Sequence, residues 1–176
     1  TGSGKTGAYL LPLLQRLPPK KALQSRRPVA LILVPTRELA QQVGEVFRQL
    51  ASHSDFSCGI IYGGVGFAHQ RKTLIAGVHV LIATPGRLID LMDQGHCLLD
   101  RVETFVLDEA DRMLDMGFQP QIEAIEQRLN KDRQSLLFSA TFPPPARRLA
   151  NKLLNQPQEV VVDEPSTIVS EVDQYV

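Results

Sequence analysis

The sequence has no excess of charge of either sign. Lys and Arg total 19, Asp and Glu total 19, and the formal net charge at pH 7 is zero. This balance excludes nucleic-acid binding through a general basic surface, so any such contact has to be local. Low-complexity tracts are absent too, and 176 residues with 43% hydrophobic content predict one compact domain instead of a disordered chain.

Cysteine is scarce and long apolar runs are missing. Cys58 and Cys97 lie in apolar surroundings without the spacing of metal ligands, which predicts small buried residues in a reducing compartment and no disulfide. The four histidines have no ligand spacing either. No apolar run approaches the roughly 20 residues that cross a bilayer, and no N-terminal leader is seen. We therefore expect no membrane contact and an intracellular, cytoplasmic location, or a nuclear one in a eukaryote.

Short apolar runs alternate with amphipathic segments along the chain. The runs are rich in Val, Ile and Leu and are bounded by Pro, Gly, Asp or Ser, which is typical of fully buried strands. The predicted strands are 29–34, 57–62, 78–83, 104–107, 135–138 and 159–162. The predicted helices are 5–17, 37–51, 67–75, 86–93, 121–129 and 146–154. This alternation predicts an α/β fold with a mostly parallel central sheet, helices on both faces and ligands at the carboxyl ends of the strands.

The chain opens on a glycine-rich segment that ends in Gly-Lys-Thr. Glycines permit turns that direct backbone N–H groups toward phosphates at a helix N-terminus. Lys5 then reaches the β and γ phosphates, and the Thr6 hydroxyl is a ligand for Mg²⁺. The candidate nucleotide-binding residues are Thr1, Gly2, Ser3, Gly4, Lys5 and Thr6. Taken alone, this segment could also be a glycine turn before an ordinary helix.

An acidic motif, Asp108-Glu109-Ala110-Asp111, follows the apolar run 105–107. A carboxylate at the end of a buried strand can hold Mg²⁺, and Glu109 on the next turn can orient or deprotonate an attacking water. We therefore predict Glu109, Lys5 and Asp108 as catalytic residues, and Thr6 and Asp108 as metal-binding residues. In isolation the motif could be an acidic helix start. Together with the glycine-rich segment it predicts a nucleoside triphosphatase.

Further segments accompany these two motifs in a fixed order. They are Pro35-Thr36-Arg37-Glu38-Leu39-Ala40, Gly63-Gly64, Thr84-Pro85-Gly86-Arg87 and Ser139-Ala140-Thr141. With them, the chain resembles the first RecA-like lobe of a DEAD-box ATP-dependent RNA helicase, almost from end to end. The resemblance implies a three-layer RecA-like P-loop NTPase domain with ATP and Mg²⁺ as cofactors.

The resemblance also implies RNA contacts at three of these segments. The residues concerned are Pro35, Thr36, Arg37, Gly63, Gly64, Thr84, Pro85, Gly86 and Arg87. Each segment lies where a strand gives way to a turn or helix, which exposes groups suited to phosphate and ribose oxygens. Arg37 and Arg87 are the strongest phosphate candidates. From the residues alone, Thr36 and Thr84 could equally be helix caps, and Gly63 part of a tight turn.

The remaining expectations concern coupling and domain organisation. Ser139 and Thr141 would link ATP turnover to unwinding through hydrogen bonds to Asp111 if their strand lies beside it, or would otherwise cap the next helix. The resemblance assigns 1–165 to the first lobe and 166–176 to the start of the interlobe linker. It places the N-terminal strand, the adenine-recognising segment and the second lobe outside this chain. We expect half an active site, completed by the second lobe of the same parent chain, and RNA bound through its backbone independently of sequence.

Two other functions are compatible with such a fold. A DNA translocase lobe is the first, but Asp111 together with Ser139 and Thr141 favours an RNA helicase. A nonenzymatic RNA-binding scaffold is the second. The intact set of Lys5, Asp108 and Glu109 argues against it, because loss of activity would be expected to erode these residues first.

Overall fold

The computed structural model describes residues 4–161. Its centre is a five-stranded sheet in the order β2-β3-β1-β4-β5, and every pair of neighbouring strands is parallel. The strands are β1 (Ala30–Leu33), β2 (Cys58–Ile61), β3 (Val80–Ala83), β4 (Thr104–Leu107) and β5 (Gln134–Leu137). This confirms the α/β fold and the parallel central sheet that the alternation of apolar runs predicts.

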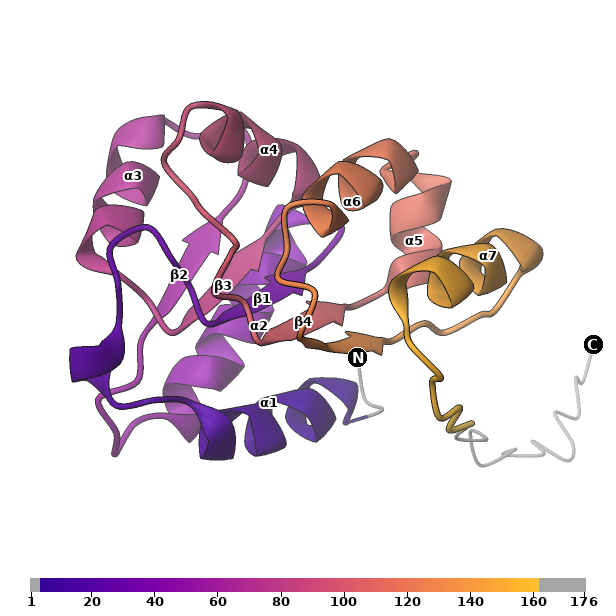
Figure 1. Ribbon diagram of the computed structural model, residues 1–176, viewed down its shortest axis with the longest axis horizontal. Coiled ribbons are helices and arrows are strands. Elements are labelled where there is room, and N and C mark those ends of the chain that lie inside the picture. The colour runs from indigo at the N-terminus through magenta and orange to yellow at the C-terminus, as the bar shows by residue number, and fades with distance from the viewer. Residues whose placement is uncertain (1–3, 162–176) are drawn as a thin grey trace, which may run out of the picture.

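Helices cover both faces of the sheet (Figure 1). They are α1 (Lys5–Arg16), α2 (Arg37–Leu50), α3 (Phe67–Ala76), α4 (Pro85–Asp93), α5 (Ala110–Asp115), α6 (Gln119–Glu126) and α7 (Pro144–Leu153), with a short 3₁₀ turn at Lys20–Ala22. Helices α1 and α2 lie on one face, and α3 to α7 lie on the other. The three-layer arrangement is therefore confirmed.

The alternation of side chains along each strand builds two cores. In β1, Leu31 and Leu33 belong to the core beneath α3 to α7, whereas Ala30 and Ile32 belong to the core beneath α1 and α2. All four residues are at most 1% exposed. A strand buried on both faces has to be apolar throughout, which is why these runs show no polar alternation.

The prediction of a sixth strand over 159–162 is wrong for residues 159–161. These residues have no regular structure, and residue 162 lies outside the described part of the chain. Val160 and Val161 are 77% and 73% exposed, so their apolar side chains contact no sheet. An apolar pair alone does not make a strand, because strand formation also requires a neighbour that supplies hydrogen bonds.

The described residues contain no helix that is both long enough and apolar enough to cross a membrane. The predicted interlobe linker, 166–176, lies outside the described residues.

His79 is a fully buried polar residue just before β3. The Ser57 N–H donates to its Nδ1 over 3.0 Å, so Nδ1 carries no proton and Nε2, 3.1 Å from the Pro18 carbonyl oxygen, is the donor. The Phe56 ring packs edge-on against the imidazole, with 5.1 Å between the ring centroids. Burial lowers the pKa of His79 below its ordinary value, because the charged form would lose its hydration.

This buried imidazole should make stability depend on pH. The unfolded chain takes up a proton at about pH 6.5 while folded His79 does not, so the free energy of unfolding should fall as the pH drops below about 6.5 toward the lower folded pKa. Urea denaturation between pH 5 and pH 8 measures this dependence. The free energy of unfolding of His79→Asn should fall less steeply with decreasing pH than that of the wild-type protein. The exposed His53 is a matched control, and His53→Asn should keep the wild-type profile. Parallel profiles for wild type and His79→Asn would contradict this assignment.

Candidate functional site

The predicted site residues gather at the carboxyl edge of the sheet. The segments starting at Pro35, Gly63 and Thr84 follow β1, β2 and β3, which are three consecutive strands. Asp108 is the first residue after β4, and Ser139 is the second residue after β5. In the sheet, β4 and β5 lie on the side of β1 opposite to β3 and β2. The sheet order therefore divides this edge into a half with the expected RNA segments and a half with the expected nucleotide residues.

The N-terminus of α1 has the properties of an anion site. Gly4 precedes the helix in a left-handed conformation (φ 69°), no side chain caps the helix, and its first turn has no acidic residue. The first backbone N–H groups therefore remain available for phosphate oxygens. Lys5 and Thr6 are partly exposed at the same end. Thr1, Gly2 and Ser3 lie outside the described residues.

Asp108 is 4% exposed, and both of its carboxylate oxygens accept hydrogen bonds. The Tyr9 hydroxyl donates to Oδ2 over 3.0 Å, and the Glu109 N–H donates to Oδ1 over 3.0 Å. Burial raises the pKa of Asp108, whereas these two hydrogen bonds and the charge of Lys5 act in the opposite direction. The contact with Tyr9 brings α1 and the acidic motif together.

Glu109 is the residue just before α5, and its backbone is in the left-handed region, with φ 54° and ψ 51°. This conformation costs a residue with a side chain about 1–2 kcal/mol, and such strain is common at functional sites. Arg112 donates from Nη1 to Glu109 Oε2 over 3.2 Å. This ion pair was not predicted, and the i,i+3 spacing of the two residues is the sequence signal that could have indicated it.

Asp111 is hydrogen-bonded to the segment after β5. Both the N–H and the hydroxyl of Thr141 donate to Asp111 Oδ2, over 2.9 Å and 2.8 Å. The Asp111 N–H donates to Ser139 Oγ over 3.2 Å, and that hydroxyl donates to the Thr141 carbonyl oxygen over 2.6 Å. Burial acts to raise the pKa of Asp111, but the hydrogen bonds outweigh it and the pKa lies below its ordinary value. The predicted hydrogen bonds are therefore present.

The residues around Asp108 suit Mg²⁺ held together with a phosphate ligand. Among residues 4–161, no group of three or more His, Cys, Asp or Glu could form a protein-only metal site. Mg²⁺ commonly uses one or two carboxylates, a hydroxyl, phosphate oxygens and water. A buried carboxylate close to a helix N-terminus that is open to phosphate matches this chemistry.

Thr36 and Arg37 have different surroundings at the start of α2. Thr36 caps the helix, because its Oγ1 accepts from the Leu39 N–H over 3.2 Å. Arg37 is exposed, and its guanidinium lies 4.9 Å from the centre of the Tyr62 ring. Arg37 is thus free to contact a phosphate, whereas the capping alternative for Thr36 is the observed one.

Arg87 has a mostly buried side chain with several protein contacts. Its side chain is 9% exposed, its guanidinium lies 4.1 Å from the centre of the Phe67 ring, and Nη1 donates to the Val65 carbonyl oxygen over 2.9 Å. The guanidinium therefore already has protein partners at this position, and the side chain ties the loop after β2 to the start of α4.

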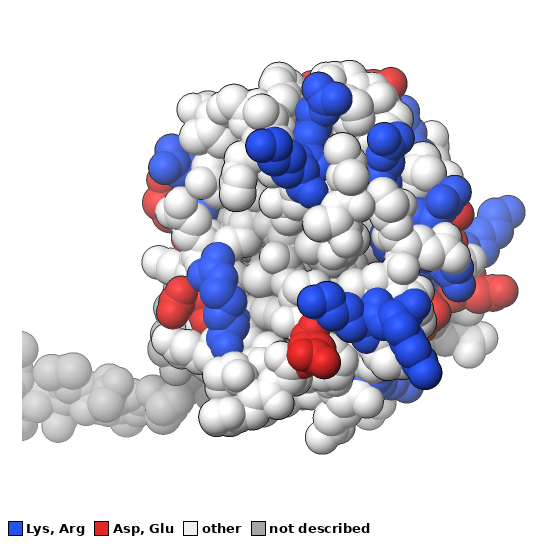
Figure 2. Space-filling view, turned by 90° about the vertical axis from the view of Figure 1, so that its left-hand side faces the viewer, with Lys and Arg blue, Asp and Glu red and all other residues white. Residues whose placement is uncertain are grey.

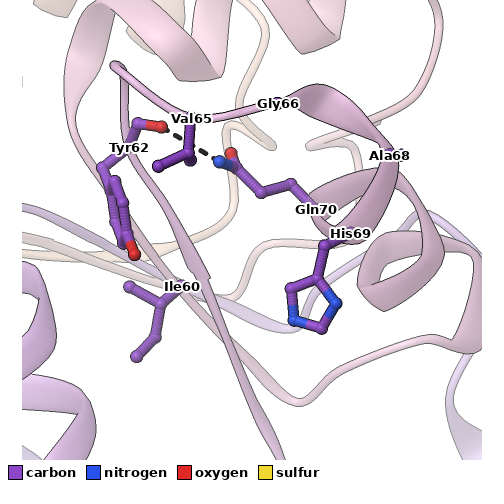
Figure 3. A pocket seen from close by; sticks show the side chains of 7 residues that line it. All are labelled: Ile60, Tyr62, Val65, Gly66, Ala68, His69 and Gln70. Atoms are coloured by element: carbon purple, nitrogen blue, oxygen red, sulfur yellow. Dashed lines mark hydrogen bonds between the residues drawn. The ribbon is translucent and has the colours of Figure 1, made fainter.

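The loop at 63–66 is exposed and borders a shallow hollow of about 430 Å³ (Figure 3). Gly64 has φ 79°, a conformation that favours glycine. Gln70 Nε2 donates to the Tyr62 carbonyl oxygen over 3.0 Å and closes the loop from the side of α3. The hollow is lined by neither Lys5 nor Asp108, so it is distinct from the expected nucleotide site.

Basic side chains are dispersed over the side of the molecule that carries α3 and β2. Figure 2 shows this face with Lys and Arg separated by uncharged surface and interspersed with a few acidic residues. No continuous basic surface is seen there, which agrees with the balanced composition.

The comparisons with known proteins identify the family. Residues 1–149 match the family model described as DEAD/DEAH box helicase. The chain belongs to this family. The helicase-family chain is 48% identical over 163 residues to DEAD-box ATP-dependent RNA helicase 30 of Arabidopsis thaliana, and 46% identical over 163 residues to ATP-dependent RNA helicase DBP2 of Encephalitozoon cuniculi. Each match covers 92% of the chain, with 28% and 33% of the respective relative.

A solved structure supports the same conclusion. A DEAD box protein from the hyperthermophile Methanococcus jannaschii superposes with a TM-score of 0.81 and 39% sequence identity, covering 89% of this chain and 41% of that one. The helicase-family chain thus spans about a quarter to a third of the length of the two curated relatives described above.

Two residues of the helicase-family motifs are prolines in the turns that follow β1 and β3. Pro35 and Pro85 are both buried, although they stand among the predicted RNA-contacting residues. Pro85 occupies the first position of α4, where its fixed φ and missing N–H fit a helix start. We therefore expect these prolines to shape the turns that present Thr84, Gly86 and Arg37.

Proposed function

We propose that the chain is the first RecA-like lobe, residues 1–165, of an ATP-dependent RNA helicase, with 166–176 starting the interlobe linker. The observation that carries this proposal is the divided carboxyl edge. The acidic motif follows β4 and the coupling segment follows β5, the expected RNA segments follow β1 to β3, and the hydrogen bonds between Asp111 and Thr141 join the ends of β4 and β5. The two relatives described above are named as ATP-dependent RNA helicases.

In the proposed nucleotide site, each residue has a separate task. The N–H groups at the start of α1 and the Lys5 ammonium bind the phosphates. Thr6 and Asp108 would hold Mg²⁺, which when bound neutralises charge that develops on the phosphates. The Glu109 carboxylate accepts a proton from the attacking water, or orients that water, from its strained position at the start of α5.

The proposed RNA contacts are directed at the backbone. Thr84 begins α4 without a side-chain cap, so its hydroxyl remains available. Gly63 and Gly64 are exposed and would offer their N–H groups, and Arg37 contributes a charge. Such groups recognise phosphate and ribose, so binding should not depend on base sequence.

The coupling role follows from the position of Asp111. It stands in the first turn of α5, two residues after Glu109, while Thr141 and Ser139 stand in the segment after β5. A displacement of that segment would therefore move Asp111 and the start of α5 together. We propose that this linkage transmits ATP turnover to the RNA half of the edge.

The two arginines allow a direct test of the RNA half in a two-lobe protein containing this chain. Arg37→Ala should weaken single-stranded RNA binding and flatten the log–log salt dependence by about 0.7, because one phosphate contact is lost. Arg87→Ala should weaken binding without flattening the slope, because the lost contacts are to Val65 and Phe67. Fluorescence anisotropy with two unrelated RNA sequences and a nonhydrolysable ATP analogue measures both quantities.

Arg101 offers a matched control at the opposite edge of the sheet. It is exposed just before β4, and Arg101→Ala should leave affinity and salt slope unchanged. If Arg37→Ala also has no effect, the proposed RNA surface is wrong. If DNA of the same length binds equally well, the translocase alternative gains support. Normal RNA binding without any ATP turnover would favour the scaffold.

A further inference from the structure

Tyr9 is a buried aromatic residue with its hydroxyl inside the proposed nucleotide site. Its side chain is 1% exposed, and its ring packs against Phe138 with a centroid distance of 5.3 Å. The hydroxyl donates to Asp108 Oδ2 across 99 residues of sequence. Tyr9 lies outside the motifs that mark the site in the sequence, although a hydroxyl on an otherwise apolar helix face is a signal that a buried polar partner exists.

The hydroxyl contacts one of the two side chains proposed to hold Mg²⁺. It donates to Asp108 Oδ2 over 3.0 Å. Thr6 stands one turn before Tyr9 on α1, so both project from the same side of the helix. The packing on Phe138 restricts the ring and therefore the position of the hydroxyl.

The second carboxylate oxygen is fixed from the other direction. Oδ1 accepts the Glu109 N–H, which belongs to the strained start of α5. With one donor on each oxygen, the carboxylate has a single orientation. Ligating carboxylates are commonly held in this way by hydrogen-bonding partners, and loss of such a partner typically reduces metal affinity.

We propose that Tyr9 is a positioning residue that orients the Asp108 carboxylate for the metal ion of the bound nucleotide. The inference rests on the proposed nucleotide site and adds to it a residue outside its motifs. Tyr9 contacts no substrate in this assignment and acts only through Asp108.

The test uses Tyr9→Phe in the full-length protein, which removes the hydroxyl and keeps the ring on Phe138. The affinity for a fluorescent ATP analogue is titrated against Mg²⁺ and repeated in EDTA. We expect the Mg²⁺ concentration at half-maximal effect to rise about 10-fold. Affinity in EDTA should stay unchanged, because the phosphate contacts of α1 are intact. A purely packing function for Tyr9 would not move the Mg²⁺ dependence.

Two controls separate the possible outcomes. Tyr62→Phe removes a hydroxyl in the RNA half and should leave the Mg²⁺ dependence unchanged. In a double-mutant cycle, Tyr9→Phe should have no further effect in an Asp108→Asn background, because Tyr9 acts through that carboxylate. An unchanged Mg²⁺ requirement in Tyr9→Phe, or additive effects in the cycle, would overturn this inference while leaving the proposed function intact. Absence of nucleotide binding by the wild-type protein would overturn the proposed function itself.

If Tyr9→Phe does not fold, Tyr9→His provides a second variant, whose shorter ring places its N–H donor nearer the helix than the Tyr9 hydroxyl. Rescue of folding with a raised Mg²⁺ requirement supports the positioning function. Rescue with the wild-type requirement contradicts it, because a displaced donor should not orient the carboxylate equally well.

Discussion

Residues 1–176 alone should hydrolyse ATP about 10³-fold more slowly than a two-lobe protein that contains them, with or without RNA. On the proposed function, the arginines that complete the site belong to the second lobe. An arginine supplied to the γ-phosphate contributes on the order of 10³ to 10⁵ in rate. A single lobe also leaves the nucleotide open to water on one side, which weakens every electrostatic interaction in the site.

Steady-state phosphate release by the two proteins, at equal concentration and with saturating RNA, measures the difference. The isolated chain has to be folded for the comparison, which circular dichroism and cooperative urea unfolding establish. Adding the separately expressed second lobe should restore only part of the activity, because the effective concentration given by a covalent linker is lost. RNA-stimulated turnover of the single lobe near the two-lobe rate would show that its site is complete by itself.

The fold could be predicted because the sheet is buried on both faces. The short apolar runs that became β1 and β3 are fully buried over all four residues, so composition alone marked them. The run at 159–162 is also rich in an apolar β-branched residue, yet Val160 and Val161 are exposed. Local sequence does not say whether a neighbouring strand is present to pair with such a run, and pairing is what distinguishes the two cases.

The nucleotide half of the site could be predicted from short-range spacing. Asp108, Glu109 and Asp111 are close in sequence, and the end of a buried strand fixes where they lie. The hydrogen bonds between Asp111 and Thr141 required only that β5 lie beside β4, and the family resemblance favoured them. The sequence-based expectation and the structure agree wherever one strand end determines the position of a residue.

The unpredicted features depend on contacts between distant segments. Tyr9 meets Asp108 only because α1 packs across the sheet below β4. Arg87 is withdrawn from solvent by Phe67 and Val65, which belong to a different strand–helix unit. An arginine in a motif resembles a ligand-binding residue whether or not its guanidinium already contacts another protein group. Its sequence neighbours do not show which of the two holds.

Glu109→Gln should reduce the kcat of the two-lobe protein by about 10² or more while leaving nucleotide affinity nearly unchanged. The amide keeps the size and polarity of the side chain but cannot accept a proton from the attacking water. The pair with Arg112 is exposed on the arginine side, so its loss should contribute little to stability. The backbone strain at φ 54° is the same for both side chains.

Single-turnover hydrolysis and equilibrium binding of a fluorescent ATP analogue separate the two quantities. Glu103→Gln is a matched control, because Glu103 is exposed at the opposite end of β4 and should retain wild-type kinetics. Lys5→Ala should differ from Glu109→Gln by weakening binding as well, since the removed ammonium contacts the phosphates before the reaction begins. If Glu109→Gln and Lys5→Ala both hydrolyse ATP normally, the attacking water is handled elsewhere and the assigned site is wrong. If Glu109→Gln loses binding and turnover together, the carboxylate holds the nucleotide, or the fold around Asp108, and does not act on the water.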